Sequence, residues 1–304
     1  MKYTIISCSV PAGTILSHTK ETEVDIKWAF KGSKSKIFTY IRMMWFKYNF
    51  PMKKIWLNNA LSDLGDVMIV FDSCVNEYIL AWLKKMYSDK RFIFYYWNSI
   101  NHTSFPVEKV RELGYEVWGF DPADASKYQY RLNPQFFCHN WYNSLDPADV
   151  PEVDIGFVGR DKNGRMQLVQ KVLSELNKID NCTSSIYITA PKWYLYFFNR
   201  NYKRILNFED MIRKEMRARI LLDVANSERC GYTLRVYDAL CNGRKLITNN
   251  INIIDEDFYD KRNSFVYGLD SPEDFETFVN TDFSREKEDK LENSNMSNWL
   301  ARFL

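Results

Sequence analysis

Residues 231–248 read Gly-Tyr-Thr-Leu-Arg-Val-Tyr-Asp-Ala-Leu-Cys-Asn-Gly-Arg-Lys-Leu-Ile-Thr. This pattern predicts a tight turn at Gly231, a short helix capped by Thr233, and a helix end at Gly243. The apolar run at 245–248 then predicts a parallel strand. The order of turn, helix and strand is typical of α/β folds with a parallel sheet.

The first turn of the predicted helix has the chemistry of an anion-binding site. Its backbone amides have no partner within the helix, and Arg235 adds a positive charge. Asp238 follows one helical turn later, where a carboxylate can accept hydrogen bonds from ribose hydroxyls. We therefore expect a nucleoside diphosphate here, with Gly231, Thr233 and Arg235 at the pyrophosphate and Asp238 at the ribose. In the alternative interpretation, Arg235 and Asp238 form an ordinary ion pair within the helix.

The same stretch resembles the second domain of GT-B glycosyltransferases, in particular the bacterial group 1-like family of surface polysaccharide and lipopolysaccharide synthesis. Residues 248–250, 257–259 and 263 look like the loop that follows this strand in such enzymes. Residues 154–165 are similar to the opening strand and phosphate-side loop. The resemblance covers residues 154–268. Many relatives have Glu in place of Asp238, and Glu228 is the nearby candidate for a second acidic residue of the wider superfamily.

The resemblance implies an α/β fold of two Rossmann-like domains that face a cleft. The donor would bind the second domain and the acceptor the first, with Gly159 and Arg165 on the other side of the phosphates. The implied activity is metal-independent transfer of a sugar from a nucleotide-diphosphate donor to a glycan or lipid-linked acceptor in the bacterial cytoplasm. Two alternatives stay open: a catalytically silent GT-B-like partner subunit and a sugar-nucleotide epimerase.

Strands and helices are predicted to alternate along the whole chain. The predicted domains are 1–148 on the acceptor side and 149–304 on the nucleotide-sugar side, divided where several prolines punctuate a polar stretch. The charged residues after 271 predict a solvated helix and tail. We expect strands at 3–7, 67–71, 92–97, 116–120, 155–158, 186–189 and 218–224, and helices at 75–87, 107–113, 165–179 and 207–217.

A transferase that inverts the sugar needs a base on the acceptor side, whereas a retaining one can use the leaving phosphate. Three residues follow predicted strands of the first domain, where the cleft edge is expected. They are His18, Asp72 and His102. His139, the third histidine, lies near the predicted domain boundary.

Composition excludes several classes of protein. The 304 residues have a formal net charge of +2, too balanced for nucleic acid as the main partner. The six Cys form no CxxC pair, which is typical of a reducing cytoplasm, and no window approaches the ~18 apolar residues of a membrane span.

Neither a secretory signal nor a HxxxH, GxSxG, Walker or GxGxxG motif occurs. The acidic residues at 255–257 resemble a metal-binding carboxylate pair, but they lie in a loop after a different strand from the one that such a pair follows. We therefore expect no metal. We also expect no cofactor.

Residues 37–57 combine ten aromatic or methionine side chains with Arg and Lys. This makeup is typical of a segment that contacts an anionic membrane surface, which would place the protein peripherally at the inner face of the cell membrane. The alternative is a buried helix whose long cationic side chains extend to water.

Overall fold

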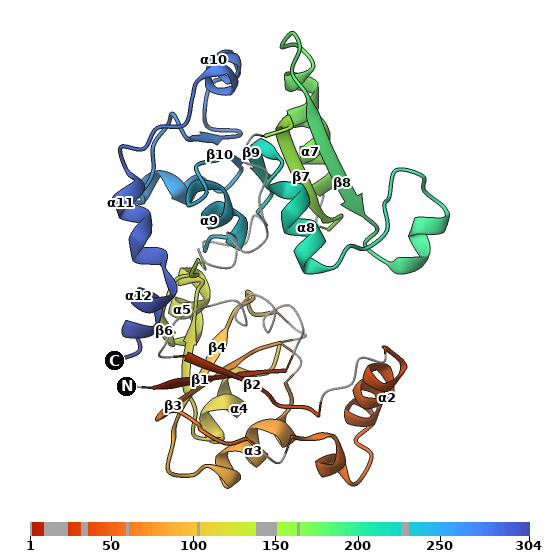
Figure 1. Ribbon diagram of the computed structural model, residues 1–304, viewed down its shortest axis with the longest axis vertical. Coiled ribbons are helices and arrows are strands. Elements are labelled where there is room, and N and C mark those ends of the chain that lie inside the picture. The colour runs from red at the N-terminus through yellow and green to blue at the C-terminus, as the bar shows by residue number, and fades with distance from the viewer. Residues whose placement is uncertain are drawn as a thin grey trace. The chain divides into compact units, whose positions relative to one another are not determined.

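The computed structural model describes residues 2–8, 24–31, 36–58, 61–73, 75–101, 104–137, 151–162, 165–225 and 231–304. His18, His102, His139 and Glu228 lie outside these ranges. The chain forms two units, Met1–Asn133 and Pro134–Leu304, so the division precedes the predicted boundary at 148. Each unit has one parallel sheet with helices packed on it (Figure 1).

The first unit has a six-stranded sheet in the order β2-β1-β3-β4-β5-β6, with all neighbours parallel. Continuous apolar runs form its central strands, as expected for a sheet covered on both faces. Its elements are β1 (Tyr3–Ser7), β2 (Val24–Trp28), α2 (Lys36–Lys47), the 3-10 helix η1 (Lys53–Trp56), β3 (Val67–Phe71), α3 (Glu77–Met86), β4 (Arg91–Tyr96), α4 (Val107–Glu112), β5 (Glu116–Gly119), α5 (Pro122–Tyr128) and β6 (Arg131–Leu132).

The second unit has a five-stranded parallel sheet in the order β11-β10-β9-β7-β8. Its elements are β7 (Val153–Arg160), α7 (Arg165–Leu176), β8 (Ser184–Thr189), η2 (Trp193–Phe197), α8 (Phe208–Glu215), β9 (Ala218–Asp223), α9 (Leu234–Leu240), β10 (Lys245–Thr248), η3 (Ile251–Asp255), β11 (Ser264–Val266), η4 (Pro272–Asp274), α10 (Phe275–Asn280), α11 (Glu288–Leu291), η5 (Glu292–Ser294) and α12 (Met296–Ala301).

The helix and strand predicted at 231–248 are confirmed as α9 and β10. Thr233 is the N-cap of α9, and its hydroxyl accepts a hydrogen bond from the amide of Arg235. At the other end Gly243 has φ +63°, and the amides of Gly243 and Arg244 bond to the carbonyls of Leu240 and Ala239. This is a Schellman motif, which Gly favours because it lacks a Cβ.

The C-terminal residues correct the prediction of a solvated tail. Trp299 and Phe303 are fully buried, and Leu291 and Met296 are also buried. The ring of Trp299 packs against Phe136, with centroids 4.6 Å apart. Residues after 271 therefore form short helices with an apolar inner face, although their outer face is charged.

Candidate functional site

The second sheet has a topological switch point between β7 and β9. From β7 the chain goes to β8 on one side and then returns to β9 on the other. In open parallel sheets, ligands bind outside the carboxyl ends of the strands at such a point. The polar side chains at the ends of β7 and β9 are therefore the place to look for a ligand site.

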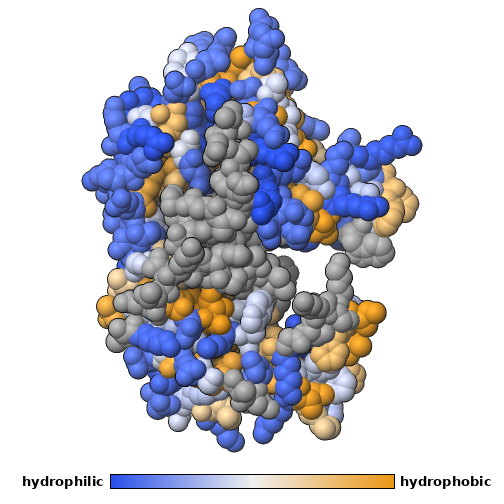
Figure 2. Space-filling model, in the orientation of Figure 1, coloured by the Kyte–Doolittle hydropathy of each residue, from blue (hydrophilic) through white to orange (hydrophobic). Residues whose placement is uncertain are grey.

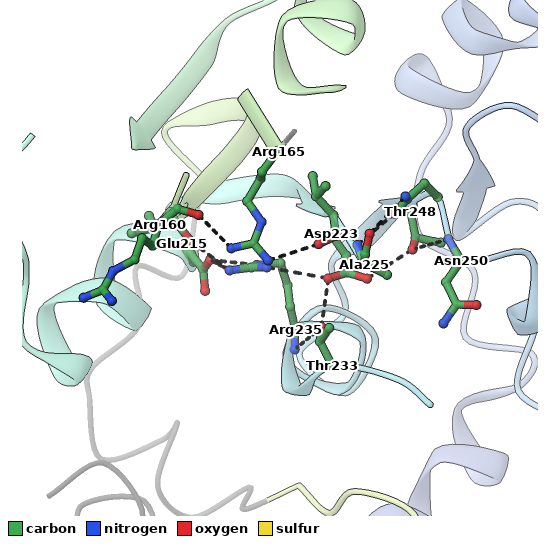
Figure 3. A network of polar contacts seen from close by, with 12 residues as sticks. Arg160, Arg165, Glu215, Asp223, Ala225, Thr233, Arg235, Thr248 and Asn250 are labelled. Carbon is green, nitrogen blue, oxygen red and sulfur yellow. Dashed lines mark hydrogen bonds and ion pairs between the residues drawn. The ribbon is translucent and has the colours of Figure 1, made fainter. Parts of the chain in front are cut away.

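Two arginines lie at this switch point. Arg165, the first residue of α7, donates hydrogen bonds to the carbonyl of Arg160 at 2.9 Å and to that of Val224 at 3.3 Å. It therefore joins the ends of β7 and β9. The side chain of Arg160 is exposed, and Figure 3 shows its guanidinium directed away from the polar network.

Arg235 lies under this surface and bonds to buried groups. Its guanidinium contacts Glu215 at 2.8 Å and Asp223 at 3.6 Å, and donates to the carbonyl of Val158 at 2.7 Å. Both carboxylate side chains are 1% exposed and that of Arg235 is 13% exposed. Burial raises the pKa of Glu215, while Arg235 opposes this shift. These contacts correct the expected geometry, in which Arg235 faced an anion or paired with Asp238.

Asp223 connects β9 to its neighbours. One carboxylate oxygen accepts a hydrogen bond from the hydroxyl of Thr233 at 2.8 Å, and the other accepts one from Thr248 at 3.1 Å (Figure 3). Asn249 bonds through its side chain to the amide and carbonyl of Ala225. The carboxyl ends of β9 and β10 and the start of α9 are thus held together by side chains.

The other predicted donor-site residues are placed as follows. Gly159 lies in β7, where a Cβ would be 2.8 Å from the ring of Phe157, so the position excludes a side chain for packing reasons. Gly231 is buried, and its carbonyl accepts a hydrogen bond from Asn250 at 3.4 Å. Asp238 is only 4% exposed, and burial raises the pKa of its carboxyl well above the ordinary value. Arg165, Thr233 and Arg235 are brought together around the ends of β7 and β9, with Gly159 beside Arg165, whereas Asp238 is buried within α9.

We expect Thr233→Ala to lower the free energy of unfolding by about 1–2 kcal/mol, because the helix loses its N-cap and Asp223 loses a donor. Urea unfolding of the full chain measures the change. Thr233→Ser keeps the hydroxyl and should cost less than Thr233→Ala; equal losses would contradict this role.

The first sheet has its own switch point between β1 and β3, and Asp72 directly follows β3 there. Its carboxylate accepts hydrogen bonds from the amides of Trp97 and Asn98 at 3.2 and 3.3 Å, and from the side chain of Asn98. Burial raises the pKa of Asp72 to about 6, although the hydrogen bonds from Asn98 and Trp97 act in the opposite direction. Such a carboxyl is ionised at neutral pH and is a stronger base than an ordinary aspartate.

Sequence reasoning missed several polar residues at these edges. Asp121 lies two residues after β5 and caps α5, and Asp124 accepts a hydrogen bond from the amide of Ile100 at 2.7 Å. In the second unit, Glu215 and Asp223 were also missed. Asp121 follows the predicted strand at 116–120, so the rule that selected Asp72 would have found it too, whereas Asp223 lies inside the predicted strand at 218–224 and is the last residue of β9.

Among the residues that the structure describes, no group of three or more His, Cys, Asp and Glu side chains could hold a metal ion. The residues at the ends of β7, β9 and β10 are instead arginines, hydroxyls and amides around the buried carboxylates of Glu215 and Asp223.

No family model and no curated protein sequence matches the chain. Solved structures do match. Sucrose-phosphate synthase from Thermosynechococcus elongatus is 9% identical, with a TM-score of 0.51 over 100% of this chain and 97% of that one. Spinosyn rhamnosyltransferase SpnG with spinosyn aglycone gives 0.44 at 9% identity, covering 100% and 99%. Acinetobacter baumannii MurG gives 0.42 at 10% identity, covering 99% and 98%.

At these identities the likeness to sucrose-phosphate synthase bears on the fold alone. Together with the two parallel sheets, it shows that the chain has the α/β architecture of two Rossmann-like domains found in GT-B glycosyltransferases.

Proposed function

We propose that the protein is a glycosyltransferase that moves a sugar from a nucleotide-diphosphate donor to a glycan or lipid-linked acceptor. The observation that carries the proposal is the arginine-lined switch point of the second sheet, at which Arg165 joins the ends of β7 and β9 and Arg160 is exposed beside it. The two-domain fold and the resemblance of residues 154–268 to glycosyltransferases support the same assignment.

Electrostatics favour a diphosphate at this place. Glu215 and Asp223 are buried against Arg235. Asp161, directly after β7, accepts hydrogen bonds from the amide of Met166 and the hydroxyl of Tyr202. The exposed guanidinium of Arg160 is therefore the group proposed to face the diphosphate. Guanidinium groups bind phosphate through paired hydrogen bonds and can neutralise a leaving diphosphate without a metal ion. Arg235 and Glu215 would act indirectly, by fixing the strands under the site.

Asp72 is the proposed base on the acceptor side for an inverting reaction. Its carboxylate would accept the proton of an acceptor hydroxyl while the hydroxyl oxygen bonds to the anomeric carbon and the bond from that carbon to the diphosphate breaks. The nucleoside diphosphate leaves with the electron pair of the broken bond. His18 and His102 remain candidates from the sequence.

The finer parts of the proposal rest on the sequence resemblance. They are a bacterial setting, synthesis of surface polysaccharide or lipopolysaccharide, action in the cytoplasm, and independence of metals and cofactors.

An assay of the whole chain with a panel of sugar nucleotides tests the activity. The protein is incubated with each donor, with and without bacterial lipid extract or oligosaccharides, and products are measured by mass spectrometry. A glycosyltransferase releases nucleoside diphosphate and increases the mass of an acceptor by one sugar. Conversion of the donor to an isomer without release would identify an epimerase. Donor binding without any turnover would favour a silent partner.

We expect Arg160→Ala to weaken nucleoside diphosphate binding by roughly 10- to 100-fold, which is the effect of losing a hydrogen bond to a charged group. Stability should be unchanged, because the side chain is exposed. Isothermal titration measures the affinity. Arg217→Ala, which removes another exposed arginine of the second unit, is the matched control. Equal affinities of the two variants would remove Arg160 from the site.

A further inference from the structure

The segment of α2 and η1 presents an unusual surface in the first unit. Nine large apolar or aromatic side chains and two lysines are exposed among the described residues of this segment, although such side chains are normally buried in clusters of this size. Figure 2 shows hydrophobic residues at the surface over this segment. We define the α2–η1 surface as Ile37, Tyr40, Ile41, Met43, Tyr48, Phe50, Met52 and Ile55 with Lys47 and Lys54.

The opposite face of α2 already packs on the core. Phe38 and Trp45 contact the ring of Trp56, with centroids 4.7 and 5.7 Å apart, and Phe46 packs against Phe30 at 5.6 Å. The expectation of a buried helix is therefore right for one face only. On the other face, Ile37 is 73% exposed and Tyr40 is 62% exposed, so α2 is apolar on two sides while the core covers one.

The charged residues of this part of the chain are all positive. Residues 26–62 contain eight Lys and Arg and no Asp or Glu, whereas the whole chain has a net charge of only +2. Arg42 lies over the ring of Phe30 at 4.1 Å, and Lys53 over that of Tyr78 at 4.9 Å. The exposed apolar side chains thus belong to a stretch of sequence that carries cations and no carboxylate.

An open groove lies within the same segment. Its volume is about 580 Å³, and it is lined by Phe50, Met52, Ile55 and Tyr78 with Lys53 and Lys54. An apolar floor beside lysines matches a molecule with a hydrocarbon part and an anionic part. Phospholipids have this combination.

We propose that the α2–η1 surface binds the anionic surface of a lipid bilayer, with its apolar side chains at headgroup depth and its lysines against phosphate. Lysine is depleted in protein–protein interfaces, whereas interfacial helices combine Lys and Arg with large apolar side chains. The contact lies in the plane of the interface, because α2 has 12 residues and a span needs about 20. No described helix is long and apolar enough to cross a membrane. The proposal does not depend on glycosyl transfer.

Sedimentation with vesicles tests the proposal. The full chain should pellet with vesicles of phosphatidylglycerol and phosphatidylcholine, and pellet much less with phosphatidylcholine alone. The double variant Lys47→Glu/Lys54→Glu should bind the anionic vesicles at least about tenfold more weakly, since each lysine near such a surface contributes measurably. Ile41→Ser/Met43→Ser should also weaken binding. All four side chains are exposed, so thermal melting should stay at the wild-type temperature.

Phe197→Ser/Phe198→Ser is the matched control, because it removes two exposed aromatic side chains of the second unit, 71% and 84% exposed. It should bind vesicles as the wild type does. The proposal is overturned if the wild type does not bind anionic vesicles, or if it binds vesicles with and without phosphatidylglycerol equally well. It is also overturned if the Phe197→Ser/Phe198→Ser control loses as much binding as the α2–η1 variants. Gel filtration adds one more outcome: a wild-type dimer that Ile41→Ser/Met43→Ser disperses, with vesicle binding unchanged, would assign the surface to a second copy.

Discussion

Arg235→Ala is expected to lower the free energy of unfolding by about 3–5 kcal/mol, which is the usual cost of removing one partner of a buried ion pair. Glu215 and Asp223 would be left as buried carboxylates without their cation, and the carbonyl of Val158 would lose a donor. Urea denaturation of the full chain, followed by circular dichroism, measures the change.

Arg235→Lys is the matched control. It keeps the positive charge but cannot reach both carboxylates and the carbonyl with one planar group, so its loss should be smaller than that of Arg235→Ala. A loss below about 1 kcal/mol for Arg235→Ala would mean that the ion pair is not buried as described. A consequence for assays is that lost nucleotide binding in Arg235→Ala reports altered folding, whereas Arg160→Ala tests contact with the ligand.

Asp72→Asn is expected to lower the rate of glycosyl transfer by about 10²- to 10⁴-fold, the usual contribution of a general base. Donor affinity should stay the same, because the donor is proposed to bind the second unit. The wild-type rate should fall as the pH drops below about 6, where Asp72 becomes protonated, and this limb should be absent in the variant. Asp66→Asn, at the amino end of the same strand, is the control and should keep full activity. Transfer by Asp72→Asn at the wild-type rate would exclude this residue as the base.

The raised pKa of Asp72 also makes the free energy of unfolding depend on pH, which can be measured without a substrate. Because the folded pKa of Asp72 is about 6 and lies above the ordinary value of 3.8, its contribution to stability is greatest below pH 3.8 and is lost as the pH rises through 6. The stability of the wild type relative to Asp72→Asn should therefore fall between pH 4 and pH 7, by roughly 1–3 kcal/mol. Urea unfolding at the two pH values measures the difference, and a pH-independent difference would contradict the raised pKa of Asp72.

The sequence predicted the parts of the fold that depend on local patterns. The strands at 3–7 and 67–71 are confirmed residue for residue. Residues 67–71 are an uninterrupted apolar run that ends at Asp72, and residues 3–6 are aromatic or β-branched residues that favour a strand. β2 was missed because Asp25 and Lys27 interrupt its apolar residues, as a half-buried edge strand allows. The sequence did not predict α5, because a proline in a polar stretch is typical of a linker, whereas Pro122 is the first residue of a helix capped by Asp121.

The sequence predicted the helix and strand that carry Thr233 and Arg235, but it did not predict the partners of these side chains. Residue types near 231–248 predicted a capped helix next to a strand, and both are confirmed. The partners of Arg235 come from α8 and β9, so their contacts depend on the packing of the sheet and not on spacing along the helix. Burial of Asp238 likewise follows from packing, since its spacing from Arg235 is equally compatible with an exposed face.

The most direct test of the account is isothermal titration of the full chain with a panel of nucleoside diphosphates. The account predicts that one nucleoside diphosphate binds selectively, and that Arg160→Ala weakens this binding while Arg217→Ala does not. Absence of binding by every nucleoside diphosphate and sugar nucleotide to the folded wild-type protein would contradict the proposed donor site, and with it the assignment as a glycosyltransferase.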